Sequence, residues 1–407
     1  MNKYAKTTPE GTRDYLYEEC DARRKIESKL SALFKSKGYK KVITPTIEFF
    51  DVFNRDSAGL RPENMYSLCD TSGRLLVLRP DSTLPIARIA ATRLRDAQYP
   101  LRLYYSQRVF RRCESFSGRS DETSQCGIEL IGASGIRADL EILVTAVEAL
   151  GYCGAPAFSI EIGHAGFFKA LIDDLDAGEE IRVAIAGFVE TKNYSALNSL
   201  LDTLPESKAA TAIRSLPRLF GGESVLDEAL SYNPGKQGVE AINCLRAIYS
   251  KLPLLGLGGK IHLDLGLVHR SNYYTGVVFR GFIEGSGLTV LSGGRYDRLI
   301  GEFGRDLPAT GFGVETDALA KAMLDRGGLF PDELADVLVF GEDGCEIQAL
   351  MHANELNKDG LVCVNCLEID AEKAKQRAQT MRIPRLDIVS STGVTTLAVN
   401  AGGNNGE

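Results

Sequence analysis

Polar side chains alternate with apolar ones along a predicted strand in the first third of this 407-residue chain. Strand alternation places Gln125 and Glu129 on one face, while Cys126, Ile128 and Leu130 lie on the other. A buried carboxylate costs free energy unless a charged or hydrogen-bonding group meets it. A cationic ligand group, such as an amine or an imidazolium, would meet Glu129.

Similar groups stand at the ends of other predicted strands. The strand 75–79 leads through Pro80 into Asp81 and Thr83, the strand 101–112 carries Arg111, and the strand 273–280 begins with two phenols. Each group also has a simpler role. Carboxylates on strands are commonly exposed or paired in salt bridges, and Asp-Ser-Thr after a strand commonly caps a helix. Spacing alone leaves both interpretations open.

Metal and cofactor motifs are not predicted. Cys363 and Cys366 form a single CxxC without a second pair, and the four histidines lack metal-ligand spacing. Neither a Walker loop nor a dinucleotide fingerprint is present. Gly311-Phe312-Gly313 is too short to indicate phosphate binding, and 293–295 is most simply a turn. We therefore expect no metal and no cofactor.

The bulk composition is that of an ordinary globular protein. A net charge of −7 and a pI near 5.4 lower the expectation of nucleic-acid binding. Nine cysteines without framework spacing suit a reducing compartment. The sequence shows no apolar signal peptide and no run long enough for a membrane span, so a cytoplasmic location without membrane contact is expected.

Predicted elements divide the chain into two parts. Residues 1–325 alternate helices and strands, interrupted at about 171–257 by a helix-rich insertion. A Gly- and Pro-containing linker at 326–331 separates this part from 335–400, where strands and helices alternate as in a small α/β domain.

Taken in order, segments across residues 8–325 resemble class II aminoacyl-tRNA synthetases, and within them histidyl-tRNA synthetase. The segments that carry the resemblance are 9–15, 38–48, 65–83, 109–129, 267–276 and 292–297. The resemblance implies an α+β fold, in which an antiparallel sheet is flanked by helices. It identifies 335–400 as a shortened anticodon-binding-type domain, and 38–48 as motif 1, through which two copies of the chain would dimerise.

The resemblance also implies a histidine-binding pocket. Seven residues stand where the family contacts histidine: Asp81, Thr83, Arg111, Gln125, Glu129, Tyr273 and Tyr274. Asp81 is one carbon shorter than the glutamate usual at its position.

Two catalytic arginines of the family are missing. His269 stands at the arginine of the Leu-Val-Arg-Gly-Leu-Asp-Tyr-Tyr pattern, with Arg270 next to it. Ala318 stands at the arginine of the motif 3 pattern Gly-Phe-x-x-Gly-x-Glu-Arg, which begins at Gly311. The segment 120–124 carries Asp and Glu where a synthetase has basic and aromatic residues. Adenylate formation requires cations against the ATP phosphates, so we expect neither catalysis nor ATP binding.

A synthetase-like body with a histidine pocket and no adenylation machinery resembles the regulatory subunits of ATP phosphoribosyltransferase. That family implies a short-form catalytic subunit as partner, histidine as effector and a non-catalytic role in the first step of histidine biosynthesis. Two alternatives remain: a diverged synthetase in which Arg270 replaces the missing arginine, or a synthetase-like sensor acting on RNA or on another enzyme.

Overall fold

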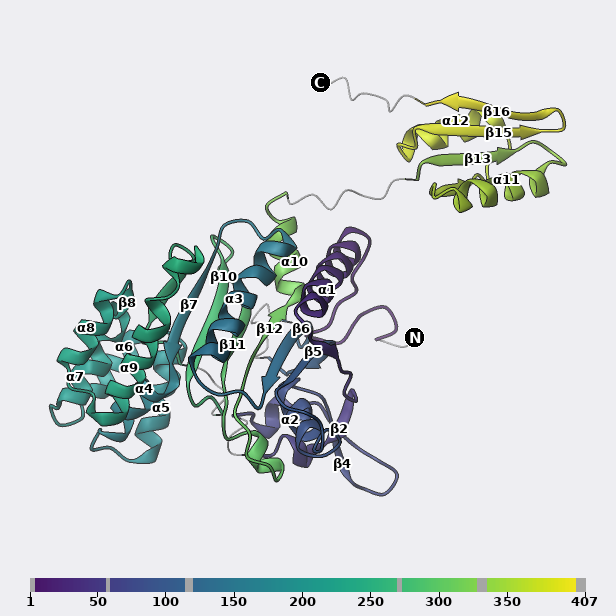
Figure 1. The fold of residues 1–407 in the computed structure, drawn as a ribbon. Coiled ribbons are helices and arrows are strands. Elements are labelled where there is room, and N and C mark those ends of the chain that lie inside the picture. Colours follow the sequence, from purple (N-terminus) through teal and green to yellow (C-terminus); the bar gives the residue numbers. More distant parts are fainter. Residues whose placement is uncertain (1–3, 56–58, 114–119, 269–272, 328–334, 400–407) are drawn as a thin grey trace. The chain divides into compact units, whose positions relative to one another are not determined.

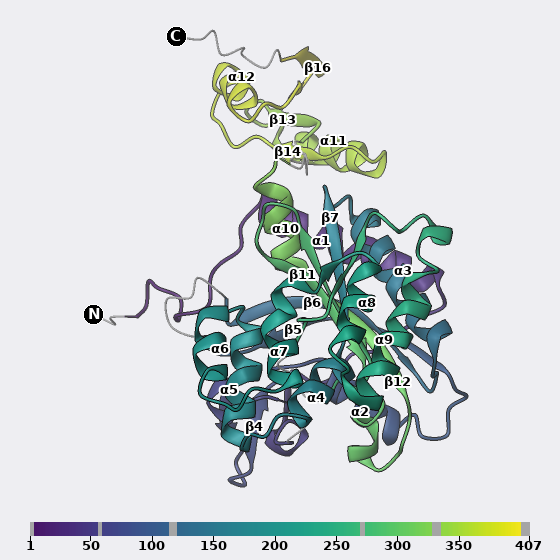
Figure 2. The same cartoon turned by 90° about the vertical axis from the view of Figure 1, so that its left-hand side faces the viewer.

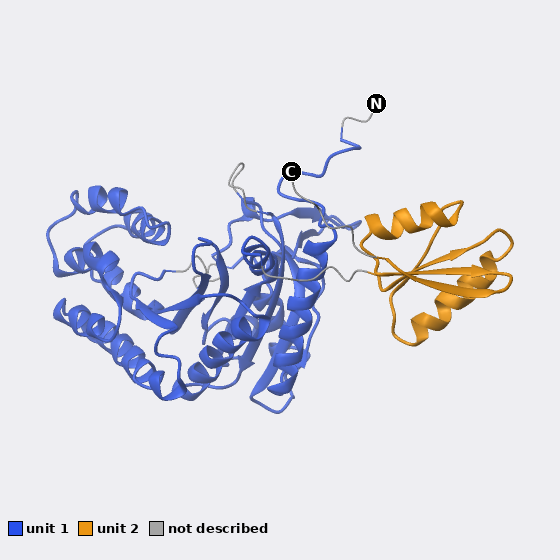
Figure 3. Cartoon of the chain, turned by 90° about the horizontal axis from the view of Figure 1, so that it is seen from above, with its two compact units in different colours: residues 1–328 blue, residues 329–407 orange. Residues whose placement is uncertain are grey.

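The computed structural model describes residues 4–55, 59–113, 120–268, 273–327 and 335–399. The chain forms two compact units, residues 1–328 and 329–407 (Figures 1 and 3). No helix within the described ranges is long and apolar enough to cross a membrane.

The first unit is built on a nine-stranded sheet with the order β1-β5-β6-β12-β11-β10-β7-β9-β8. The strands are β1 (Lys40–Lys41), β5 (Leu101–Phe110), β6 (Glu122–Ile131), β7 (Phe158–His164), β8 (Phe220–Gly221), β9 (Ile261–Asp264), β10 (Val277–Ile283), β11 (Thr289–Arg295) and β12 (Ala309–Glu315). All neighbours are antiparallel except the pairs β1–β5 and β7–β9. This largely antiparallel sheet with flanking helices confirms the predicted α+β architecture.

The helices α1 (Glu18–Ser36), α3 (Ile136–Cys153) and α10 (Thr316–Leu324) pack together beside the sheet (Figure 1). In α1 the buried residues recur every four positions: Ala22, Ile26, Leu30 and Phe34. This spacing forms one apolar stripe along a helix. The Phe34 ring reaches Tyr104 on β5 and Phe312 on β12, with ring centroids 6.1 and 5.9 Å away. The apolar face of the strands is therefore sealed from water.

A smaller sheet of order β2-β4-β3, with β2 (Ile47–Phe49), β3 (Ser67–Cys69) and β4 (Leu75–Leu78), leads into α2 (Thr83–Ala91). Val77 of this sheet and Leu84 and Ile86 of α2 belong to one buried cluster with Tyr105 of β5. The cluster therefore attaches the small sheet and α2 to the polar side of the main sheet.

Six helices separate β7 from β9 and form the helix-rich insertion (Figure 2). They are α4 (Ala165–Asp173), α5 (Glu179–Glu190), α6 (Tyr194–Leu201), α7 (Lys208–Ser215), α8 (Ser224–Ser231) and α9 (Gly235–Tyr249). The insertion also contributes β8, which pairs with β9 at the end of the main sheet.

Three sequence-based expectations about strands are corrected. The segment 293–295 is not a turn but part of β11, where a Cβ on Gly293 would stand 2.4 Å from the Gly311 carbonyl oxygen, so glycine is required for the approach. The sequence pattern also predicts a strand at 260–268, but this strand ends at Asp264, whose carboxylate accepts a hydrogen bond from the Gly266 amide. The next strand begins at Val277 rather than at Tyr273.

The second unit has a four-stranded sheet of order β14-β13-β15-β16. Its elements are β13 (Val337–Gly341), α11 (Glu346–Lys358), β14 (Cys363–Asn365), α12 (Ala371–Thr380), β15 (Arg385–Ser390) and β16 (Gly393–Ala398). One buried cluster joins Leu338 and Leu386 to Ala374 of α12, and another joins Val337 and Val389 to α11. The two helices therefore cover opposite faces of this sheet.

Candidate functional site

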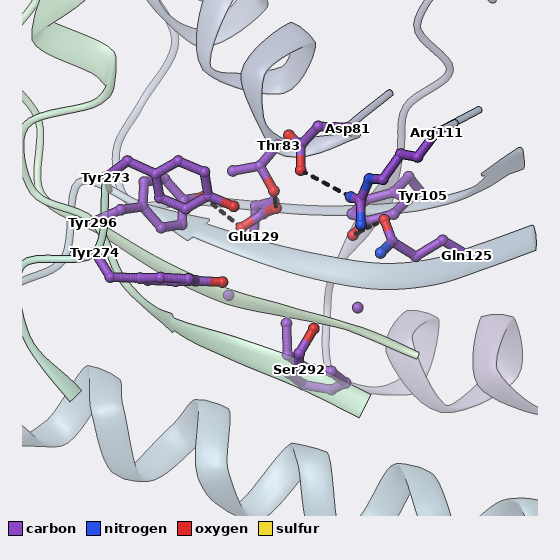
Figure 4. Close-up of a pocket in the computed structure, with 13 residues that line it drawn as sticks. Asp81, Thr83, Tyr105, Arg111, Gln125, Glu129, Tyr273, Tyr274, Ser292 and Tyr296 are labelled. Atoms are coloured by element: carbon purple, nitrogen blue, oxygen red, sulfur yellow. Dashed lines mark hydrogen bonds and ion pairs between the residues drawn. The ribbon is translucent and has the colours of Figure 1, made fainter. Parts of the chain in front are cut away.

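A hollow of about 460 Å³, partly open to solvent, lies on the polar side of the main sheet (Figure 4). The seven residues singled out from the sequence all line it. Six further residues complete the lining: Tyr105, Ser292, Tyr296, Gly311, Phe312 and Gly313. The structure thus brings together residues of β5, β6, β11 and β12 and of the segments that follow β5 and β11 and lead into α2 and β10.

Glycines form part of the floor. A Cβ on Gly311 would stand 1.9 Å from Glu129 Oε2, and one on Gly313 would stand 2.8 Å from the Gln125 side chain. On β6, a Cβ on Gly127 would stand 2.6 Å from the Tyr105 hydroxyl. Only glycine leaves room for these polar side chains. The Gly311-Phe312-Gly313 segment is too short to indicate phosphate binding from its sequence, but in the structure it forms part of the cavity floor.

Glu129 lies at the bottom of the cavity and is 2% exposed. Thr83 Oγ1 donates a hydrogen bond to Glu129 Oε1 over 2.9 Å, and the Tyr296 hydroxyl donates to Oε2. Burial raises the pKa of Glu129 to about 8, although these two hydrogen bonds act in the opposite direction. Glu129 can therefore exchange a proton near neutral pH.

Three tyrosines form an aromatic wall beside Glu129. The ring centroids of Tyr273 and Tyr274 are 4.7 Å apart, and those of Tyr273 and Tyr296 are 5.7 Å apart. Burial raises the pKa values of Tyr274 and Tyr296, so both phenols stay protonated. Tyr296 was missed as a site residue, although it belongs to the segment 292–297 that carried part of the resemblance.

Arg111 stands at the other end of the cavity (Figure 4). Its Nη2 lies 3.5 Å from Asp81 Oδ2, and its Nε donates to the Pro80 carbonyl oxygen over 2.5 Å. Burial lowers the pKa of Arg111, but the carboxylates of Asp81 and Glu315 outweigh this effect and the net shift is upward. The guanidinium is therefore a permanent positive charge, within reach of an anionic group.

Asp81 caps a helix, as its sequence context allowed, and also lines the cavity. Its Oδ1 accepts a hydrogen bond from the Leu84 amide over 2.9 Å and thereby caps the first turn of α2. Its Oδ2 faces Arg111. The carboxylate couples the start of α2 to the cavity.

Of the two positions at which the resemblance implies an arginine, His269 lies outside the described residues. Ala318 lies in the first turn of α10, next to Asp317. The Asp317 carboxylate contacts Arg23 Nε at 2.5 Å and accepts hydrogen bonds from the Ser124 amide and the Tyr15 hydroxyl. These contacts hold the start of α10 against β6 and α1.

The acidic segment after the motif 2-like strand is also fixed by internal contacts. The Asp121 carboxylate accepts hydrogen bonds from the Tyr66 hydroxyl and from the Cys113 amide, over 2.5 and 2.8 Å. Its backbone amide donates to the Gly11 carbonyl oxygen. A negative charge is therefore fixed within the segment where the resemblance implies basic and aromatic residues.

Metal ligands are not gathered anywhere in the described ranges, where no group of three or more His, Cys, Asp or Glu could hold an ion. Cys363 and Cys366 lie in the second unit and are partly buried free thiols.

The cavity offers the two ends of a dipolar ligand site, with carboxylates and phenols around Glu129 and a guanidinium at Arg111. It suits a small molecule that carries both charges.

Comparisons with known proteins identify the family of the chain. The family model described as histidyl-tRNA synthetase matches residues 11–319. An ATP phosphoribosyltransferase regulatory subunit of Clostridium kluyveri is 38% identical over 392 residues, which cover 95% of this chain and all of that protein. One of Bacillus cereus is 38% identical over 365 residues, covering 88% and 86%.

Solved structures give the same result. A protein of Bacillus halodurans, described as an ATP phosphoribosyltransferase regulatory subunit/histidyl-tRNA synthetase, has a TM-score of 0.79 and 31% identity, and covers 92% of this chain and 97% of its own. A histidyl-tRNA synthetase of Nostoc has a TM-score of 0.78 at 21% identity, covers 97% of each chain and shares the fold. The predicted class II synthetase-like fold is confirmed, and the chain belongs to the family of ATP phosphoribosyltransferase regulatory subunits, whose main domain is that of histidyl-tRNA synthetases.

Proposed function

We propose that this chain is a non-catalytic subunit that activates the short-form catalytic subunit of ATP phosphoribosyltransferase, and that free histidine binds its cavity as the feedback effector. The names of its relatives support the regulatory role. The chain would then act in the first step of histidine biosynthesis, through its partner.

The observation that most directly supports histidine binding is the placement of acidic and basic groups in the cavity. Asp81 and Glu129 are 7% and 2% exposed, and Arg111 stands at one end beside Asp81. A zwitterion satisfies such a site because each of its charges meets an opposite one. In our proposal the α-carboxylate of histidine meets Arg111, and its ammonium meets Asp81, Thr83 and Gln125. The imidazole then lies against Tyr274 and reaches Glu129.

The charged groups near the cavity also account for the proposed loss of the synthetase reaction. Ala318 supplies no positive charge, and Asp121 and Glu122 add negative ones close to the end of β5. The transition state of adenylate formation needs cations against the phosphates, and removing one such group typically costs roughly 10²–10³ in rate. A pyrophosphate exchange assay separates this proposal from a diverged synthetase, which requires histidine-dependent exchange.

The direct experiment is an ATP phosphoribosyltransferase assay with the short catalytic subunit from the same genome. We expect activity to rise when this chain is added and to fall again when histidine is added. The result that would reject the regulatory role is unchanged activity together with separate elution of the two proteins in size-exclusion chromatography.

Calorimetry tests the cavity itself. Glu129→Ala removes a hydrogen-bond partner of the positively charged imidazolium and should weaken histidine binding by about 1.5–3 kcal/mol. The matched control is Glu161→Ala, because Glu161 is a partly buried carboxylate on β7 that does not line the cavity. Equal affinity of the Glu129 variant and the wild type would reject the pocket assignment.

Self-dimerisation is the second part of the proposal. Ile47, Phe49 and Leu68 lie on one face of the small sheet and are 47%, 45% and 36% exposed. Their neighbours on the other face, Glu48 and Val77, are buried. An exposed apolar face of this kind is typical of a protein–protein contact. A second copy of the chain would cover it, as the motif 1 resemblance implies.

A further inference from the structure

Glu315, the last residue of β12, stands next to the cavity at the end that Arg111 occupies. It is opposite Gln125 in the register of β12 and β6, so the two side chains project from the same face of the sheet. Gln125 Nε2 donates to Glu315 Oε1 over 3.0 Å, and the Tyr105 hydroxyl donates to Gln125 Oε1 over 3.1 Å. Two residues of the cavity wall are thus linked to a carboxylate immediately behind them.

The carboxylate of Glu315 also acts on Arg111. Asp81 and Glu315 both raise the pKa of Arg111, against the lowering caused by burial. Two carboxylates of the protein therefore partly offset the positive charge of Arg111, and that of Asp81 lies 3.5 Å from the guanidinium. A singly charged anionic group from a ligand can still approach Arg111, but further negative charge at this end meets repulsion from Glu315.

The substitution pattern around Glu315 points the same way. The motif 3 pattern that begins at Gly311 has its second glycine at position 315 and its arginine at position 318. This chain has Glu315 and Ala318 instead. At position 315 a carboxylate side chain stands in place of the hydrogen atom of a glycine, and at position 318 a methyl group stands in place of a guanidinium. Both changes disfavour the binding of an anion on the Glu315 side of Gln125.

We propose that Glu315 determines the ligand class of the cavity, so that the cavity accepts a free amino acid and rejects the same amino acid joined to a nucleotide. This inference rests on the proposed histidine site and adds its specificity. An acyl-adenylate has no free carboxylate for Arg111 and brings a phosphate toward Gln125. Glu315 opposes that phosphate by charge and by volume.

The experiment measures two ligands on four proteins by isothermal titration calorimetry. The ligands are free histidine and histidyl sulfamoyl adenosine, a non-hydrolysable adenylate analogue with a negative sulfamate in place of the phosphate. The proteins are the wild type, Glu315→Gln, Glu315→Gly and the control Glu161→Gln. Gln at 315 keeps an acceptor oxygen for Gln125 and removes only the charge, and a thermal melt verifies that each variant folds.

For wild type and for the control Glu161→Gln, we expect histidine binding and no detectable binding of the analogue. In Glu315→Gln the analogue should bind at least about tenfold tighter than in the wild type, since a like charge a few ångströms away is removed. Glu315→Gly should bind it tighter still because space is added. In Glu315→Gln the affinity for histidine should change by less than about threefold, since the amide keeps an acceptor oxygen for Gln125.

The outcomes distinguish the two proposals. If folded Glu315 variants gain no affinity for the analogue, or if the control gains as much, the role of Glu315 is rejected whatever histidine does. If the wild type fails to bind histidine while Glu315→Gln gains the analogue, the effector proposal is rejected and the selectivity role stands. If none of the four proteins binds either ligand, both are rejected.

Discussion

Gly311 lies directly beneath the carboxylate of Glu129, so that a Cβ on Gly311 would stand 1.9 Å from Glu129 Oε2 and 2.3 Å from the Ile128 carbonyl oxygen. The two residues face each other across β12 and β6. Because Gly311 on β12 has no side chain, the space beside it holds the buried carboxyl group of Glu129 on β6.

Gly311→Ala should consequently destroy the cavity. The added methyl group meets backbone as well as a side chain, so rotation of Glu129 alone does not relieve the clash. We expect loss of histidine binding by calorimetry and a decrease of about 1–3 kcal/mol in the free energy of unfolding.

A matched control is Gly187→Ala on the exposed side of α5, where a Cβ would meet nothing within 4 Å. That change should increase the free energy of unfolding by about 0.5–1 kcal/mol, because alanine favours a helix over glycine. Histidine affinity equal to that of the wild type in Gly311→Ala would contradict the packing argument.

The stability of the first unit should depend on pH through Glu129. Its pKa is raised from 4.5 to about 8 in the folded state because it is buried. The folded state therefore holds a proton that the unfolded state has lost. The stabilisation is complete below pH 4.5 and is lost as the pH rises through 8, with a slope of up to about 1.4 kcal/mol per pH unit.

Glu129→Gln should flatten this dependence between pH 6 and 8 in urea unfolding, since an amide does not titrate. Glu240→Gln, at an exposed side chain of α9, should leave the wild-type slope unchanged. Parallel curves for the wild type and Glu129→Gln would show that Glu129 does not titrate in this range.

Local pattern was enough to predict part of the site. Alternation along β6 put Gln125 and Glu129 on one face, and both residues line the cavity. This feature depends only on the geometry of a single strand. The order of segments along the chain, read as a resemblance, added the residues from other strands and the α+β fold.

The rest of the site depends on register between strands distant in sequence. The glycine floor is visible only once Gly311 is known to face Glu129, and Glu315 only once it is known to face Gln125. Tyr296 reaches Glu129 from the end of β11, across 167 positions of sequence. Neither periodicity nor composition encodes these distances.

The second unit should depend on a buried carboxylate. Asp387 on β15 is fully buried, and its oxygens accept hydrogen bonds from Arg385, from Thr396 Oγ1 over 2.8 Å and from His352 Nε2 over 2.8 Å. Asp387→Asn replaces one accepting oxygen with an amide that cannot accept. We expect destabilisation of this unit by about 1–3 kcal/mol.

Hydrogen exchange of residues 337–399 in the full chain measures this effect. Asp370→Asn is the control, because Asp370 is an exposed N-cap of α12 and asparagine caps a helix equally well. Protection in Asp387→Asn equal to that of the control would mean that the network does not contribute to the stability of the unit.

The small sheet makes the dimer testable. If a second copy covers the face that carries Ile47, Phe49 and Leu68, Phe49→Asp should place a charge in an apolar contact. Losing the burial of one phenylalanine should weaken the dimer by about 1.5–3 kcal/mol, and burying the charge weakens it further. Sedimentation velocity at several concentrations should then show monomer where the wild type shows dimer.

Leu254→Asp is the matched control, since Leu254 is 86% exposed and lies on the helix-rich insertion. Equal dissociation of both variants would assign the dimer to another surface, and a wild type that is monomeric at every concentration would reject it.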